Sequence, residues 1–169
     1  SEIVMADIVK IAVKITPVET IADENAGEHD IIASEVGKSL GGSGDANVTD
    51  YSGSAANQGY KDGTVNYLEV PDSINSTDIS AETTASLIYI KNTGFTFSTA
   101  IALGVALNKA VKVMSSTNLI CLLAPGEAFF LKDDNATLNG TNIHVRTVDL
   151  DGSDNVNAKH LAVEYLVVD

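Results

Sequence analysis

The sequence predicts an all-β protein built as an antiparallel β-sandwich. About eight short segments alternate apolar with polar residues or are rich in β-branched ones, turn residues separate most of them, and few stretches have helical character. This number and spacing of strands in 169 residues favours a jelly roll. An immunoglobulin-like sandwich would have fewer strands, and the chain lacks the cysteine and tryptophan pattern of that fold.

The bulk composition predicts one domain over residues 1–169. A chain of this length with 44% hydrophobic residues can bury a sizeable core. No apolar run approaches the roughly 18 residues that cross a bilayer, and the N-terminus lacks the basic region of a signal peptide, so we expect no membrane segment and no export. The single cysteine, Cys121, lies in an apolar run and is predicted to be a small buried hydrophobe.

The N-terminal half begins with a well-bounded strand and continues as polar chain. Apolar residues alternate with lysine and alanine from Val9 to Thr16, and Pro17 ends the pattern. The charged residues 23–30 predict an exposed loop. Residues 37–63 are rich in Gly, Ser, Asn and Asp and cannot build a core of their own. We predict that 37–63 is a long loop, either flexible or ordered as an arm by a partner.

Alternation and β-branched residues predict four more strands, over residues 64–70, 87–91, 143–147 and 161–167. The second of these is predicted to end in a turn at Asn92-Thr93-Gly94, because glycine supplies the backbone geometry that a tight turn requires.

Residues 100–114 fit either a strand or a helix. Ile101, Leu103, Val105 and Leu107 alternate with smaller residues, but the intervening alanines also suit a helix. Gly104 would cost a helix interior about 1 kcal/mol relative to alanine. We therefore favour strands that turn near Asn108 and resume at Val111, with a helix as the alternative.

Residues 118–133 contain two apolar runs of strand length, Leu119–Leu123 and Ala128–Leu131, separated by Pro125-Gly126. Proline and glycine at these positions suit a chain reversal, so we predict a hairpin. Both arms are apolar on both faces. This predicts burial on two sides, either in the centre of a sandwich or at a subunit contact.

The charge balance argues against nucleic-acid binding. The chain holds 23 acidic and 10 basic residues, for a net charge of −13, and its nine lysines are spread along the sequence without forming a basic patch. Solubility explains the acidic excess. The alternatives are an outward-facing protein in a salty medium, or a protein that repels nucleic acid and docks through apolar or polar contacts.

The sequence offers no pattern of a known catalytic site. His29, His144 and His160 have no metal-ligand spacing, and no phosphate loop, dinucleotide fingerprint or nucleophile elbow is present. We expect no enzymatic activity and no cofactor.

One loop could bind an ion. Asp149, Asp151 and Asp154 could contribute to the six to eight oxygen ligands that calcium prefers. However, Gly152 comes two positions too early for an EF-hand, and no bidentate glutamate follows at the twelfth position. A solvated turn between two strands is the competing interpretation.

Two segments resemble small virion proteins of tailed bacteriophages, the decoration or cement proteins of the head and related fibre-base proteins. They are Leu87–Gly94, a strand with an Asn-Thr-Gly turn, and Leu123–Phe130, which contains the Pro-Gly-Glu turn. The likeness extends from Leu87 to Val168. It implies a β-sandwich subunit, often a jelly roll, that oligomerises on a capsid without an enzymatic site, and it assigns no functional residues.

The first functional hypothesis is therefore a virion structural protein on the outer surface of a capsid. It would bind the major capsid protein and copies of itself, with a trimer favoured, and would act by burying surface. The alternative is a calcium-dependent carbohydrate-binding sandwich that uses the acidic loop and stacks tyrosines on sugars, although the lack of tryptophan weighs against it.

Overall fold

The computed structural model describes residues 7–15, 18–23, 27–32, 40–48, 60–61, 64–72, 76–80, 84–133, 137–154 and 159–168. The chain divides into two compact units, one formed by Ser1–Asp7 with Asn47–Asp169 and the other by Ile8–Ala46. The single domain over residues 1–169 stays a prediction. Among the described residues, no helix is long and apolar enough to cross a membrane.

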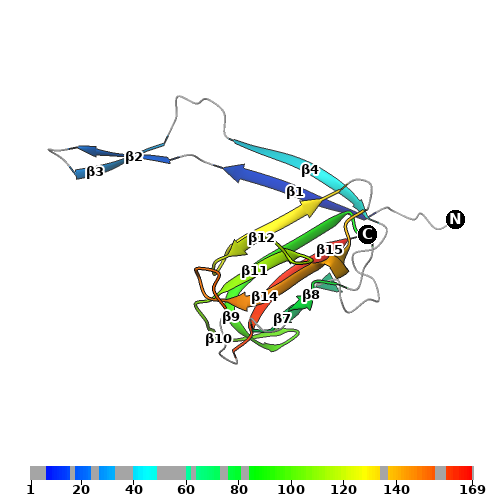
Figure 1. The fold of residues 1–169 in the computed structure, drawn as a ribbon. Coiled ribbons are helices and arrows are strands. Elements are labelled where there is room, and N and C mark those ends of the chain that lie inside the picture. Colours follow the sequence, from blue (N-terminus) through cyan, green and yellow to red (C-terminus); the bar gives the residue numbers. More distant parts are fainter. Residues whose placement is uncertain are drawn as a thin grey trace. The chain divides into compact units, whose positions relative to one another are not determined.

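The smaller unit consists of two two-stranded sheets (Figure 1). Strand β1 (Asp7–Ile15) pairs with β4 (Leu40–Val48), and the two run in opposite directions. Between them in the chain, β2 (Val18–Asp23) and β3 (Gly27–Ile32) form an antiparallel hairpin. We call this unit the ribbon.

The ribbon corrects two loop predictions. Strand β1 confirms the predicted first strand, but β3 occupies residues 27–32 and β4 occupies residues 40–48, where polar composition predicted loops. Pairing with a neighbouring strand uses main-chain groups, which glycine and serine supply as other residues do. The rest of the segment 37–63 lies outside the described residues, apart from β5 (Tyr60–Lys61), which pairs with β6 (Thr64–Val65).

Besides the β5–β6 pair, the described part of the larger unit contains two antiparallel sheets. In the first, β7 (Tyr67–Val70), β15 (Leu161–Val168) and β9 (Leu87–Thr99) lie side by side, and β13 (Ala128–Lys132) and β10 (Ala102–Ala106) both pair with β9. The second has the order β12 (Asn118–Leu123), β11 (Ala110–Ser115), β14 (Ile143–Val148) and β8 (Thr77–Asp78). A 3₁₀ turn, η1 (Gly140–Asn142), leads into β14.

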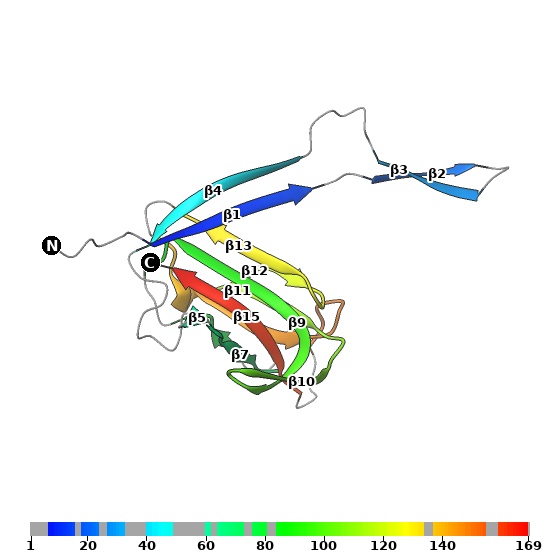
Figure 2. The ribbon, with the colours of Figure 1, turned by 180° about the vertical axis from the view of Figure 1, so that it is seen from behind.

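Four antiparallel pairs of the larger unit are nested in sequence order. Strand β7 pairs with β15, β8 with β14, β9 with β13 and β11 with β12. The earliest strand of this set thus pairs with the latest, and each following pair lies inside the previous one. The two views in Figures 1 and 2 show β10 and β13 beside opposite ends of the long strand β9.

One hydrophobic core joins the two sheets, as in a β-sandwich. Its fully buried side chains come from β9 and β15 in one sheet and from β11 and β14 in the other: Ile88, Ile90, Val111, Val113, Val145, Val163 and Val167. They recur at every second position of their strands because alternate side chains of a strand face the same side of a sheet. The strands predicted over 64–70, 143–147 and 161–167 are thereby confirmed to within a few residues.

The predicted turn at residues 92–94 is wrong. Strand β9 continues through it to Thr99, and Gly94, with φ +75°, forms part of a bulge. Leu161 lies opposite Thr96, and Val163 lies opposite Asn92. Between these two partner pairs β9 therefore contains more residues than β15, which is the mark of a bulge on β9. A glycine with positive φ serves a bulge as well as a turn, and the sequence pattern does not distinguish the two.

The segment 100–114 is confirmed as strands. It forms β10 and β11, with the connection at residues 107–109 where the sequence predicts a turn. The Lys109 amide donates to the Leu107 carbonyl, at 3.0 Å, and the Leu107 amide donates to Gly94 on β9, at 2.8 Å. These hydrogen bonds hold the β10–β11 connection, residues 107–109, next to the bulge at Gly94 of β9.

The Pro125-Gly126 turn is confirmed, but the predicted hairpin is wrong. Gly126 has φ +85° and the Glu127 amide donates to the Ala124 carbonyl at 3.0 Å, which matches a type II turn. Turns of this type splay the strands that they connect. Accordingly, β12 pairs with β11 and β13 pairs with β9, so the turn crosses from one sheet to the other. Both arms are edge strands and are not buried on two faces.

Candidate interaction surface

An exposed apolar edge is the most distinctive surface of the larger unit. Six large apolar side chains are exposed among the described residues, and five of them belong to segment 91–132: Phe95, Ile101, Val105, Leu119 and Phe130. Ile101 is 70% exposed, Val105 67% and Leu119 56%. Single exposed apolar residues are ordinary, but here five of the six come from one quarter of the chain, and a concentration of exposed apolar residues is typical of an interaction site.

The strand order places the strands that carry these residues along one side of the larger unit. Strands β10 and β13 pair with the same side of β9, and β12 is the last strand of the other sheet. The Pro125-Gly126 turn joins β12 to β13 across this side. We call the side formed by β10, β12, β13 and the end of β9 the apolar edge.

The segment of the chain that holds the apolar edge, residues 91–132, also contains β11, with Lys112, and Lys109, which is paired with Asp149. This segment differs from the rest of the chain in charge. Segment 91–132 contains four lysines and one acidic residue, Glu127, for a net charge of +3. The other 127 residues contain 22 acidic and 6 basic residues, for −16, and the two values sum to the −13 of the whole chain. From Asn92 to Asn108 no residue is charged. This difference in charge between segment 91–132 and the rest of the chain is visible in the sequence. It is the sequence signal that points to the segment containing the apolar edge.

Asn92 holds the parts of the apolar edge together. Its side chain is fully buried, and its Nδ2 donates to the carbonyls of Lys109 and Leu123, both at 2.9 Å. Its Oδ1 accepts from the Gly94 amide at 2.9 Å. Its own backbone amide donates to Glu127 and its carbonyl accepts from Gly126. One amide side chain thus connects the β9 bulge to the β10–β11 connection and to the end of β12.

Two glycines allow the close approaches that this arrangement needs. A Cβ on Gly94 would lie 3.1 Å from Cβ of Pro125, and the positive φ of Gly94 already disfavours any other residue. A Cβ on Gly104 would overlap the side chain of Thr96, whose Oγ1 accepts from the Val105 amide at 3.0 Å. The irregular pairing of β10 with β9 therefore depends on small residues.

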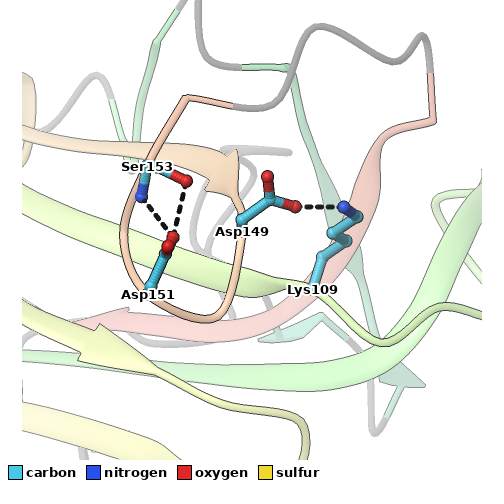
Figure 3. A network of polar contacts seen from close by, with 4 residues as sticks. All are labelled: Lys109, Asp149, Asp151 and Ser153. Atoms are coloured by element: carbon cyan, nitrogen blue, oxygen red, sulfur yellow. Dashed lines mark hydrogen bonds and ion pairs between the residues drawn. The ribbon is translucent and has the colours of Figure 1, made fainter.

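Two of the three carboxylates of the predicted ion-binding loop, those of Asp149 and Asp151, bond to different partners (Figure 3). Asp149 forms an ion pair with Lys109, whereas Asp151 accepts from the Ser153 amide at 2.9 Å and from its hydroxyl at 2.5 Å. These bonds lower the pKa of Asp151 because they stabilise its charged form. Asp154 is exposed, and its backbone forms an isolated antiparallel β-bridge with Val148. No group of three candidate metal ligands occurs in the part of the chain that is described.

Two histidines have carboxylate partners that the sequence analysis missed. His144 Nδ1 lies 2.7 Å from Asp78 Oδ1, and His160 Nδ1 lies 2.7 Å from Glu69 Oε1. His144 and Asp78 face each other across β14 and β8. Such cross-strand partners are distant in sequence, so local spacing does not reveal them. The side chain of His29 lies outside the described residues.

Cys121 is half-buried on β12, where the sequence predicts a buried hydrophobe, and packs against the core. Burial raises the pKa of its thiol, and the charge of Glu127 raises it further. We expect the rate of iodoacetamide alkylation to rise with pH through a midpoint above that of N-acetylcysteine, because the thiolate is the reactive form.

Glu127→Gln provides the matched test of that cause. It should lower the midpoint while leaving it above that of the free thiol, since burial is the larger effect. A midpoint in the native protein equal to that of N-acetylcysteine would contradict the expected shift.

Comparisons of this chain with protein-family models, curated proteins and solved structures found no match.

Proposed function

We propose that this chain is a structural subunit of a virus particle, a capsid decoration or cement protein on the outer surface of the shell. The observation that carries the proposal is the apolar edge, with five exposed large apolar side chains in a segment that holds one acidic residue. The resemblance of Leu87–Gly94 and Leu123–Phe130 to virion proteins of tailed bacteriophages supports this choice of assembly. Both segments contribute to the edge.

The proposed mechanism is burial of surface without chemistry. Fully burying a large apolar side chain contributes about 1.5–3 kcal/mol, so an edge with several half-exposed ones is suited to a stable contact. A subunit that binds the assembled shell and not its separated parts stabilises the shell by mass action, by about 2.7 kcal/mol at a free concentration 100 times Kd. The partners are the major capsid protein and copies of this chain, with a trimer as the proposed assembly.

We further infer that the larger unit is a jelly roll. The nesting of its four antiparallel pairs supports this topology, since folding one long antiparallel ribbon into two layers pairs the first strand with the last. Such a frame leaves its edges and loops free for contacts with neighbouring proteins.

The acidic remainder of the chain supports an outward position. A net charge of −16 outside segment 91–132 repels nucleic acid and keeps the protein soluble when it is not bound to a shell. The contact to a shell would then be made where acidic residues are scarce.

The experiment is to purify virus particles from producing cells by density gradient and to search them for this chain by mass spectrometry. We expect the chain in the particle fraction at a fixed ratio to the major capsid protein, and its removal should lower the temperature at which particles disrupt. A chain that is absent from particles and monomeric at millimolar concentration would refute the proposal.

A further inference from the structure

The outer face of the first sheet carries a row of apolar side chains. Phe130 on β13 lies directly opposite Tyr89 on β9, and Tyr89 lies directly opposite Leu166 on β15. Their neighbours along the three strands all pack against the core: Phe129, Leu131, Ile88, Ile90, Tyr165 and Val167. Because successive side chains of a strand point to opposite faces, the row lies on the face away from the core. Phe130 is 39% exposed, and the other two side chains are half-buried, so the row is partly accessible.

Two charged residues and a further ring lie beside this row. Glu164 on β15 is directly opposite Lys91 on β9, and each is two residues along its strand from the row, so both lie on the same face. On its other side Glu164 lies opposite Tyr67 on β7, whose ring extends the face. The outer face of β13, β9, β15 and β7 thus combines three aromatic rings with one acid and one base. We call it the aromatic face.

The polar groups of the aromatic face are available to a ligand. The Tyr89 hydroxyl donates to Glu164 Oε1 at 3.5 Å. Burial raises the pKa of Tyr89, and the charge of Glu164 raises it further, so the hydroxyl stays protonated at neutral pH. In the part of the chain that is described, the Lys91 ammonium forms no hydrogen bond or ion pair, and Oε2 of Glu164 accepts no hydrogen bond. A donor and an acceptor therefore lie side by side next to the rings.

This combination fits a carbohydrate better than a protein or a small molecule. The centre of a protein interface is depleted of lysine and glutamate, whereas here both lie among the rings. Small molecules bind in concave sites, whereas the outer face of a sheet is open and suits an extended chain. The opposite charges of Lys91 and Glu164 cancel, so the face selects neither an anion nor a cation. A neutral sugar ring has a C–H face that stacks on aromatic rings, and its hydroxyls both donate and accept.

We propose that the aromatic face binds a neutral polysaccharide. Phe130, Tyr89 and Tyr67 contact the C–H faces of sugar rings, while Lys91 donates to hydroxyls and Glu164 accepts from them. Phe130 belongs also to the apolar edge, because β13 is an edge strand of this sheet. The inference goes beyond the proposed function and does not depend on it, since the free chain is sufficient for binding.

Affinity electrophoresis of the native chain tests the proposal. Three soluble neutral polysaccharides, hydroxyethylcellulose, laminarin and dextran, are each cast in a native gel. The net charge of −13 moves the chain toward the anode, and binding retards it. We expect retardation by at least one of the three, with Kd obtained from its dependence on polysaccharide concentration. Migration equal to that of serum albumin, relative to a gel without polysaccharide, in all three gels would overturn the proposal.

Substitutions at Phe130 test whether the aromatic face is the site. Phe130→Ala removes the most exposed ring and should raise Kd by about fivefold or more, whereas Phe130→Tyr keeps the ring and should change Kd by less than about twofold. Leu119→Ala is the matched control, because Leu119 is an exposed apolar residue on β12 of the other sheet, and it should leave Kd unchanged. Circular dichroism verifies the fold of each variant. Equal effects of Phe130→Ala and Leu119→Ala would overturn the proposal.

Substitutions of the two charged residues test the polar contacts. Lys91→Leu and Glu164→Leu remove the donor and the acceptor, and each should raise Kd by about threefold or more. Glu164→Gln keeps an acceptor and should bind more tightly than Glu164→Leu. If no polysaccharide retards the chain but Phe130→Ala abolishes self-association in sedimentation velocity, the face is a protein contact and the carbohydrate proposal fails. The capsid proposal is tested separately, because that experiment uses particles and this one uses the free chain.

Discussion

Replacing Asn92 with leucine is expected to destabilise the protein by about 3–5 kcal/mol. Leucine is similar in size but cannot replace the three side-chain hydrogen bonds, so the Gly94 amide and the carbonyls of Lys109 and Leu123 lose a partner in a site that is fully buried. Each buried polar group left without a partner costs about 1–3 kcal/mol. Urea unfolding followed by circular dichroism measures the change, which is a large fraction of the 5–15 kcal/mol typical of a domain.

Two further variants test whether the donated hydrogen bonds of Asn92 cause this loss of stability. Asn92→Asp retains the acceptor but loses the two donated bonds and buries a charge, so it should destabilise at least as much at neutral pH. Asn108→Ala removes an exposed asparagine near the same turn and should change stability by less than about 0.5 kcal/mol. A loss below 1 kcal/mol for Asn92→Leu would mean that the side chain does not hold the apolar edge together.

Thr147→Val should have the second largest effect, a loss of about 2–3 kcal/mol. The Thr147 hydroxyl donates to the Val70 carbonyl at 2.8 Å and accepts from the Leu161 amide at 3.2 Å, and the residue is fully buried. Valine has nearly the same shape, so the variant leaves packing intact and removes both bonds. The loss follows from the cost of the two groups left unsatisfied, and urea unfolding measures it.

Thr147→Ser separates the hydroxyl from the methyl group. Serine keeps both hydrogen bonds and loses one buried methyl, which costs about 1 kcal/mol. The expected order of stability is native, then Ser, then Val. A serine variant less stable than the valine variant would show that packing, and not the hydroxyl, is the important contribution at this position.

Asn92 and Thr147 have a common role on opposite sides of the fold. Asn92 extends from β9 to the end of β12, and Thr147 extends from β14 to β7 and β15, so each connects one sheet to the other. Hydrophobic contacts alone hold two sheets together without a strong preference for one alignment. Directional bonds in a buried site add that preference, which would fix how the apolar edge is assembled.

Much of the secondary structure of the second half follows from local pattern. Alternation located β11, β14 and β15 because the side-chain period of a strand is a property of neighbouring residues. The course of β9 through residues 92–94 did not follow, because its bulge depends on Asn92 bonding to carbonyls 17 and 31 residues away. The strand β4 was missed because its pairing requires main-chain groups and few large side chains.

The sequence alone determines the β class, the position of most strands in the second half and the separation of charge between segment 91–132 and the rest of the chain. These properties depend on composition and on local spacing. Only the tertiary structure shows that Leu119–Leu123 and Ala128–Leu131 lie at the edge and not at the centre. The reason is physical: two apolar strands look alike in sequence, and their exposure is decided by which strands lie beside them.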